Sequence, residues 1–64
     1  MNAQETKTPP ALHRHLLALG ERQRAALRAD SVAALRSAWP HREVPRARWV
    51  IWANVTMLRE LRSL

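Results

Sequence analysis

Histidines and acidic residues, which often carry metal binding or catalysis, are few in this chain and poorly spaced for either. His13 and His15 are two residues apart, so on a helix they point to nearly opposite sides and cannot share a metal ion. His41 lies in a proline-containing segment with no second ligand nearby in sequence. We therefore expect no metal site and interpret the histidines as surface or interface residues.

The acidic residues give no sign of an active site. Those beyond the N-terminal segment lie close to arginines, where ion pairing keeps a carboxylate ionised instead of tuning it as a general acid or base. They are Glu21, Asp30, Glu43 and Glu60. The sequence also lacks a glycine-rich phosphate loop and a glycine-flanked serine, and 64 residues leave no room for a sizeable substrate pocket. We expect a protein that is not an enzyme and that uses no cofactor.

Tryptophan and arginine carry the strongest functional signal in the sequence. Trp49 and Trp52 fall away from the main apolar stripe of their expected helix, on the same side as Arg48 and Arg59. Tryptophan and arginine are also the residue types that dominate interface energetics. One interpretation is a partner-binding surface, and the other is that both tryptophans pack against the leucines of the preceding helix. The partner-binding residues of the first interpretation are Trp39, Trp49, Trp52, Arg48 and Arg59.

Arginine accounts for ten of the eleven basic residues, and the formal net charge is +6. A stripe of guanidinium groups along a helix is able to follow a phosphate backbone. The candidates for such contacts are Arg14, Arg22, Arg28, Arg36, Arg46 and Arg48. Against this, acidic residues interrupt the basic surface, no recognised nucleic-acid-binding motif is present, and a solvated charged face explains the same pattern. DNA or RNA binding is therefore the alternative function, and membrane binding is a weaker one.

Asn54 stands near the centre of an apolar stripe on the second expected helix. A buried amide needs a hydrogen-bond partner, and an Asn in a helix–helix seam often pairs with its symmetry mate and fixes the register of a dimer. The predicted dimer interface consists of Val50, Ile51, Asn54, Met57, Leu58 and Leu61. The alternative is that Asn54 bonds to the other helix of its own chain.

Two long helices must position these residues, which makes the expected fold class an all-α helical hairpin. Strong helix formers fill the first half of the chain, and apolar residues recur at helical spacing in the last third. Pro40 disfavours helical geometry at Trp39, and Pro45 is suited to open the next helix. The predicted order is a disordered tail at 1–8, then one domain at 9–64 with a helix at about 10–38, a loop at 39–45 and a helix at about 46–63.

The apolar stripe of the first expected helix changes side partway along. Its early members are Leu12, Leu16, Leu19, Gln23, Ala26 and Leu27, and its late members are Val32, Leu35 and Trp39. A straight continuous helix would expose one of the two sets. We therefore expect a break or kink near residues 29–31, while Gly20, the only glycine, weakens the helix locally.

The length of the chain indicates that it needs a partner. A domain of this size buries only roughly 60% of the surface of its unfolded chain. Small proteins commonly add disulfides, a metal or another subunit, and this chain has no cysteine. Two hairpins packing into a bundle would supply the missing core. The N-terminus lacks the apolar stretch of a signal peptide, so we expect a soluble cytoplasmic protein.

These features together predict a small regulatory or inhibitory binding protein that dimerises and contacts a larger protein. By analogy of size and fold alone, such proteins are often encoded by phages or other mobile elements.

Overall fold

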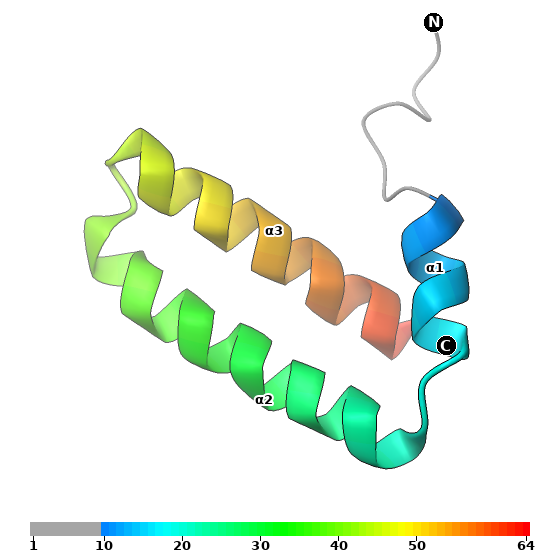
Figure 1. Ribbon diagram of the computed structural model, residues 1–64. Helices are drawn as coiled ribbons and strands as arrows, with labels where there is room; N and C mark the ends of the chain where they lie inside the picture. The colour runs from blue at the N-terminus through cyan, green and yellow to red at the C-terminus, as the bar shows by residue number, and fades with distance from the viewer. Residues whose placement is uncertain (1–9) are drawn as a thin grey trace, which may run out of the picture.

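The computed structural model describes residues 10–64, and this part of the chain is all-α (Figure 1). Helices make up 85% of these residues, which contain no strand. The all-α class predicted from the sequence is confirmed. The predicted disordered tail at 1–8 lies outside the described residues. The elements are α1 (Pro10–Leu17), α2 (Glu21–Ala38), the short 3₁₀ helix η2 (Trp39–His41) and α3 (Pro45–Arg62).

The predicted helix at 10–38 is divided, and its interruption lies at residues 18–20 instead of near residue 30. Gly20 has extended geometry (φ −78°, ψ 168°) and is the N-cap of α2. Its N–H donates to Oε1 of Gln23 at 3.0 Å, and Arg24 donates from Nε and Nη2 to the carbonyl of Leu19 at 3.3 and 3.1 Å. These bonds satisfy backbone groups that a continuous helix would otherwise pair, so the turn is stable here.

The expected break or kink at residues 29–31 was wrong, because α2 continues through them without interruption. Ser31 is buried (4% exposed), and so small a side chain lets α3 approach closely. The exposure of apolar residues that a continuous helix was expected to cause is nevertheless observed, because Val32 and Trp39 remain 36% and 54% exposed. Two of the three late apolar residues are thus left on the surface, Leu35 is half-buried, and the helix does not break to bury the set.

The connection between α2 and α3 is more helical than the predicted loop. Trp39 keeps right-handed helical geometry (φ −58°, ψ −42°) although Pro40 follows it, so the expectation drawn from that proline was wrong. Proline is accepted there because it stands at the start of the 3₁₀ turn, where its missing N–H is not needed. Val44 is extended (φ −82°, ψ 131°), as expected before a proline, and Pro45 opens α3.

The helices α2 and α3 lie side by side and run in opposite directions, while α1 packs against the C-terminal part of α3 (Figure 1). The molecule is flat, with principal extents of 36 × 34 × 14 Å. Its buried apolar residues are few: Leu16, Ala38, Ala47 and Leu61. Two of these are alanines, so the apolar area removed from water is small and much of the apolar surface stays outside.

Two features of α1 show how it packs on the rest of the molecule. Leu16 is completely buried, and Nδ1 of His13 lies 2.9 Å from Oε1 of Glu60 on α3. This pair joins elements 47 residues apart in sequence and covers the C-terminal part of the outer side of α3. The N-terminal half of that side is left uncovered. None of the helices in residues 10–64 is long and apolar enough to cross a bilayer.

Candidate partner-binding surface on α3

Two tryptophan side chains stand next to each other on the uncovered half of α3. Trp49 is 70% exposed and Trp52 is 53% exposed. Their ring centroids are 6.1 Å apart and their planes are 82° apart, which is an edge-to-face arrangement. Such a pair is favourable by about 0.5–1.5 kcal/mol beyond its area burial, so each ring helps to hold the other in place. Pro45 and Arg48 complete a shallow apolar depression around them, and we call these four residues the tryptophan surface.

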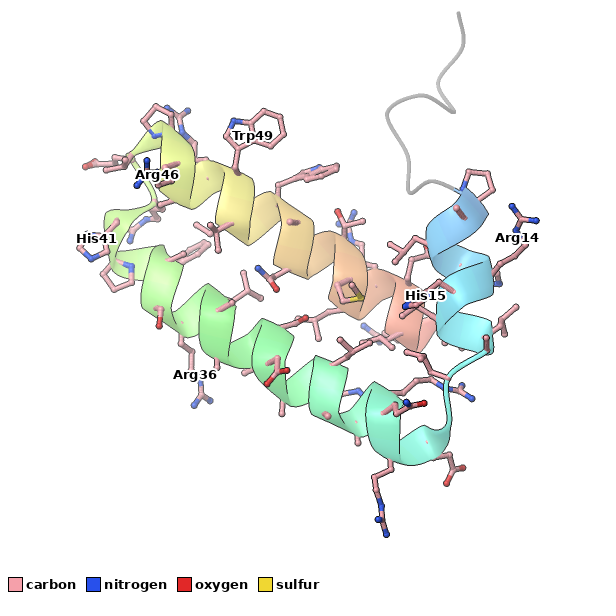
Figure 2. The ribbon with its side chains drawn as sticks, in the orientation of Figure 1. Arg14, His15, Arg36, His41, Arg46 and Trp49 are labelled. Carbon is pink, nitrogen blue, oxygen red and sulfur yellow. The ribbon has the colours of Figure 1, made fainter. Side chains whose placement is uncertain are left out.

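Helical periodicity places the tryptophan surface opposite the contact between α3 and α2. The side of α3 that faces α2 contains the buried residues Ala47 and Leu61, with Ile51 and Asn54 between them at helical spacing. The tryptophans fall on the far side, and Figure 2 shows Trp49 pointing away from α2. The sequence interpretation in which both tryptophans pack against the leucines of the preceding helix is therefore wrong.

The structure brings together only some of the predicted partner-binding residues. Arg48 lines the depression beside Trp49 and Trp52, and Arg59 is exposed further along α3. Trp39 lies apart in η2, where the guanidinium of Arg42 is 5.2 Å from its ring centroid and Nη1 of Arg42 donates to its carbonyl at 3.0 Å. Pro45 was not predicted to belong to this surface. It precedes Trp49 by four residues, or one helical turn, and this spacing could have placed it on the same side of the helix.

The arginines are almost free of carboxylate partners. Residues 10–64 contain ten arginines and four acidic residues. Within these residues one carboxylate lies within 4.0 Å of a basic side chain: Oε1 of Glu60 is 2.9 Å from Nδ1 of His13, and no arginine has such a contact. The expectation that nearby arginines pair with the acids is therefore wrong for this part of the chain. The helix α3 contains four arginines and a single acid, Glu60, which already contacts His13. Within the described part of the chain, the arginines of α3 thus have no carboxylate within 4.0 Å, and Glu60 contributes the single negative charge of this helix.

The predicted nucleic-acid-binding arginines are all exposed, but they do not form one continuous stripe. Arg14 lies on α1, and Arg46 and Arg48 lie at the start of α3, whereas the others lie on α2 (Figure 2). Arg28 and Arg36 border a shallow depression on the outer side of α2, whose remaining lining residues are Ala25, Ala29, Val32 and Ala33. Sequence reasoning overlooked this alanine surface, although the alanines recur at four-residue spacing.

The residues predicted for the dimer interface lie mostly where α3 meets α2. Leu61 is buried, four others are half-buried, and Val50 is 37% exposed. Nδ2 of Asn54 donates to the carbonyl of Val50 at 2.7 Å, one turn earlier on the same helix. This bond satisfies part of the amide inside one chain. The pairing of Asn54 with a symmetry mate stays a prediction.

A second shallow apolar groove lies at the end of the molecule where η2 connects the two long helices. Its apolar lining includes Ala34, Val44, Ala47 and Val50, and His41 and Arg46 stand at its edge. Val44 is 49% exposed. Sequence reasoning did not find this groove, because it is formed by residues of both helices and of their connection.

Fold and surface together define a class of protein: an all-α chain with exposed aromatic and basic side chains and a small core. No protein-family model, no curated protein and no solved structure matches this chain.

Proposed function

We propose that this chain is a small, non-enzymatic binding protein that regulates a larger protein by occupying part of its surface. The observation that carries the proposal is the tryptophan surface, where two adjacent tryptophans are 70% and 53% exposed. Large aromatic side chains are rarely left in water in pairs, and buried tryptophans are common centres of binding energy in interfaces. Inhibition of the larger protein is the form of regulation that follows from covering a surface.

The size of the exposed aromatic area supports a binding role. A tryptophan side chain buries roughly 150–250 Å² when it is covered, so covering the exposed 70% and 53% would remove on the order of 250 Å² from water. At about 25 cal/mol per Å² this contributes about 6 kcal/mol before the cost of association is subtracted. Together with neighbouring contacts, this area is enough to anchor an interface.

A site-specific photo-cross-linker tests the proposal in the cells that produce the protein. Ala53 is exposed and follows Trp49 by one helical turn, so a benzoylphenylalanine there samples a partner on the tryptophan surface and leaves both tryptophans intact. The matched control is the same residue at Ala29, which is exposed on the outer side of α2. We expect a discrete protein adduct from position 53 that disappears in the Trp49→Ala and Trp52→Ala variants. Equal adducts from both positions would contradict the proposal.

Nucleic-acid binding is the second candidate, and the observation that favours it is the excess of arginines that lack a carboxylate partner within residues 10–64. Phosphate contacts release counterions, so the affinity for a duplex DNA should fall steeply with salt. Removal of Arg22, Arg28 or Arg48 should reduce the slope of that dependence by about one unit each. An affinity that barely responds to salt would contradict this candidate.

Homodimerisation is part of the same proposal. The support for it is the small core of residues 10–64, in which two of the four buried apolar residues are alanines, so that a second chain would add buried area. Light scattering at low and high salt measures the solution mass directly. A dimer that persists at high salt is the expected result, and a monomer at all concentrations would contradict it.

A further inference from the structure

We infer that the partner docks an acidic amphipathic helix along the outer side of α3, with its apolar side chains on Trp49 and Trp52 and its carboxylates on Arg48 and Arg59. This inference rests on the proposed function and names the chemistry of its partner. It follows from the spacing of the exposed residues, the distribution of charge on α3, and the position of the arginines relative to the tryptophans.

The exposed residues form one line along the helix axis. Arg48 and Trp52 are four residues apart, and Trp52 and Arg59 are seven apart, which are one-turn and two-turn spacings. At 1.5 Å per residue, the two arginines are separated by about 16 Å along the axis. A partner helix of about 14 residues, near 21 Å long, would reach both arginines. Its far end would lie beside α1, because Arg59 is exposed while His13 of α1 covers the next residue, Glu60. The surface therefore matches a short helix better than a single loop tip.

Within residues 10–64, the two arginines of this line have no close carboxylate partner. Arg48 and Arg59 are exposed, and neither has a carboxylate within 4.0 Å among the described residues. The side chain of Arg48 is held only weakly, because the bond from its Nη2 to the carbonyl of Glu43 is 3.5 Å long, at the limit of hydrogen-bonding distance. The single acid of α3, Glu60, contacts His13. Carboxylates on the partner would supply the charges that this surface lacks.

The position of the arginines distinguishes a protein partner from a lipid surface. A helix that lies in a membrane interface has a continuous apolar face with its basic residues on the borders. Here Arg48 and Arg59 are in line with Trp52, so immersing the tryptophan in acyl chains would also drag both guanidinium groups towards the apolar region. A helix with carboxylates at two fixed positions can pair both charges while its apolar side chains cover the rings between them.

A second copy of this chain that placed its own α3 on this surface would be a poor occupant. It would carry its own Arg48 and Arg59 into the contact, and α3 offers no free carboxylate to meet them. Like charges placed opposite each other in an interface are unfavourable. The charge complementarity of the surface thus favours a different, acidic chain.

The test uses a stapled helical peptide of about 14 residues, with leucines at its centre and two glutamates spaced to meet Arg48 and Arg59. A second peptide has glutamine at both positions, and a third has lysine. Binding is measured by tryptophan fluorescence with the full chain. We expect the glutamate peptide to bind about fivefold more tightly than the glutamine peptide. The Arg48→Glu, Arg59→Glu double variant should reverse the order and favour the lysine peptide, while Arg28→Glu, on α2, should leave the order unchanged.

Three results would overturn the inference. The first is equal binding, or no binding, of the glutamate and glutamine peptides. The second is a preference for vesicles of anionic phosphatidylglycerol over the peptides, which would assign the surface to lipid. The third is tighter binding of single-stranded oligonucleotide.

The photo-cross-link from position 53 separates this inference from the proposed function. An adduct that survives in the Arg48→Glu, Arg59→Glu variant would overturn the acidic helix and leave a protein target in place. Loss of the adduct in that variant, with the adduct retained in Arg28→Glu, is the expected result.

Discussion

Replacing Trp49 with alanine should cost much less stability than replacing Leu16 with alanine, although tryptophan is the larger residue. Trp49 is 70% exposed and Leu16 is 0% exposed. The covered 30% of Trp49 corresponds to roughly 60 Å² of side-chain surface, or about 1.5 kcal/mol at most. Part of that area is also buried in the unfolded ensemble, which lowers the loss. Alanine is the better helix former, which lowers it further. The edge-to-face contact with Trp52 is lost as well, at the low end of about 0.5–1.5 kcal/mol because both rings are more than half exposed. A net loss of about 1 kcal/mol is expected.

Leu16→Ala removes a side chain that is wholly enclosed, so the lost transfer free energy adds to the cost of a cavity. Substitutions of this kind destabilise by about 2–5 kcal/mol. Because Leu16 is the largest fully buried side chain of the described residues and lies on the short helix α1, this loss should release α1 or unfold the chain.

Urea unfolding followed by circular dichroism at 222 nm compares the two variants, and Ala53→Gly serves as a control for helix propensity on the exposed side of α3. Trp49→Ala should keep its helical signal and its urea midpoint close to that of the parent chain. If Trp49→Ala destabilises the protein as much as Leu16→Ala does, the tryptophan belongs to the core and the argument for a binding surface fails.

The remaining predictions concern the turn at Gly20, the contact of α1 with α3, and the exposure of the rings. Gly20→Ser should stabilise the protein by about 0.5–1 kcal/mol, because the φ of −78° suits any residue and serine is a good N-cap. An added Cβ would meet only Oε1 of Gln23, at 3.9 Å. A lower melting temperature of the variant would contradict this prediction. A double-mutant cycle of His13→Ala and Glu60→Gln should give a coupling free energy of unfolding of about 0.5 kcal/mol, because the pair is partly solvated. A coupling near zero would show that this contact does not help to hold α1. Acrylamide should quench the fluorescence of the free protein almost as strongly as that of the urea-unfolded chain, and strong protection would contradict the exposure of Trp49.

Local composition was sufficient to predict the class of the fold but not the position of its break. Alanine, leucine and arginine favour helix over most of the chain, and Pro45 opens α3 as expected. The break at Gly20 depends on hydrogen bonds from Arg24 to the carbonyl of Leu19 and between Gln23 and Gly20, which no periodicity reports. The change of apolar side along the first helix did not predict that α2 would continue through Ser31, which is buried in the structure.

The candidate site could be predicted in part. The helical wheel separated Trp49 and Trp52 from the side of α3 that faces α2, and that separation is a property of spacing alone. Their exposure was not predictable from spacing, because it depends on how far α1 extends along α3. The separation of Trp39 from the other two tryptophans likewise required the geometry of η2, whereas the lack of carboxylate partners for the arginines required side-chain distances.

The shortness of α1 has a consequence for the dynamics of the molecule. A helix of eight residues is unstable in water by itself, because its few hydrogen bonds do not offset the entropy of nucleation. Helix formation in α1 and its docking on α3 are therefore one event, and the backbone amides of α1 should exchange with solvent deuterium together, each time Leu16 leaves its site. Exchange at these amides measures how often the C-terminal half of the outer side of α3 is uncovered, and hence how often the uncovered side extends along the whole helix.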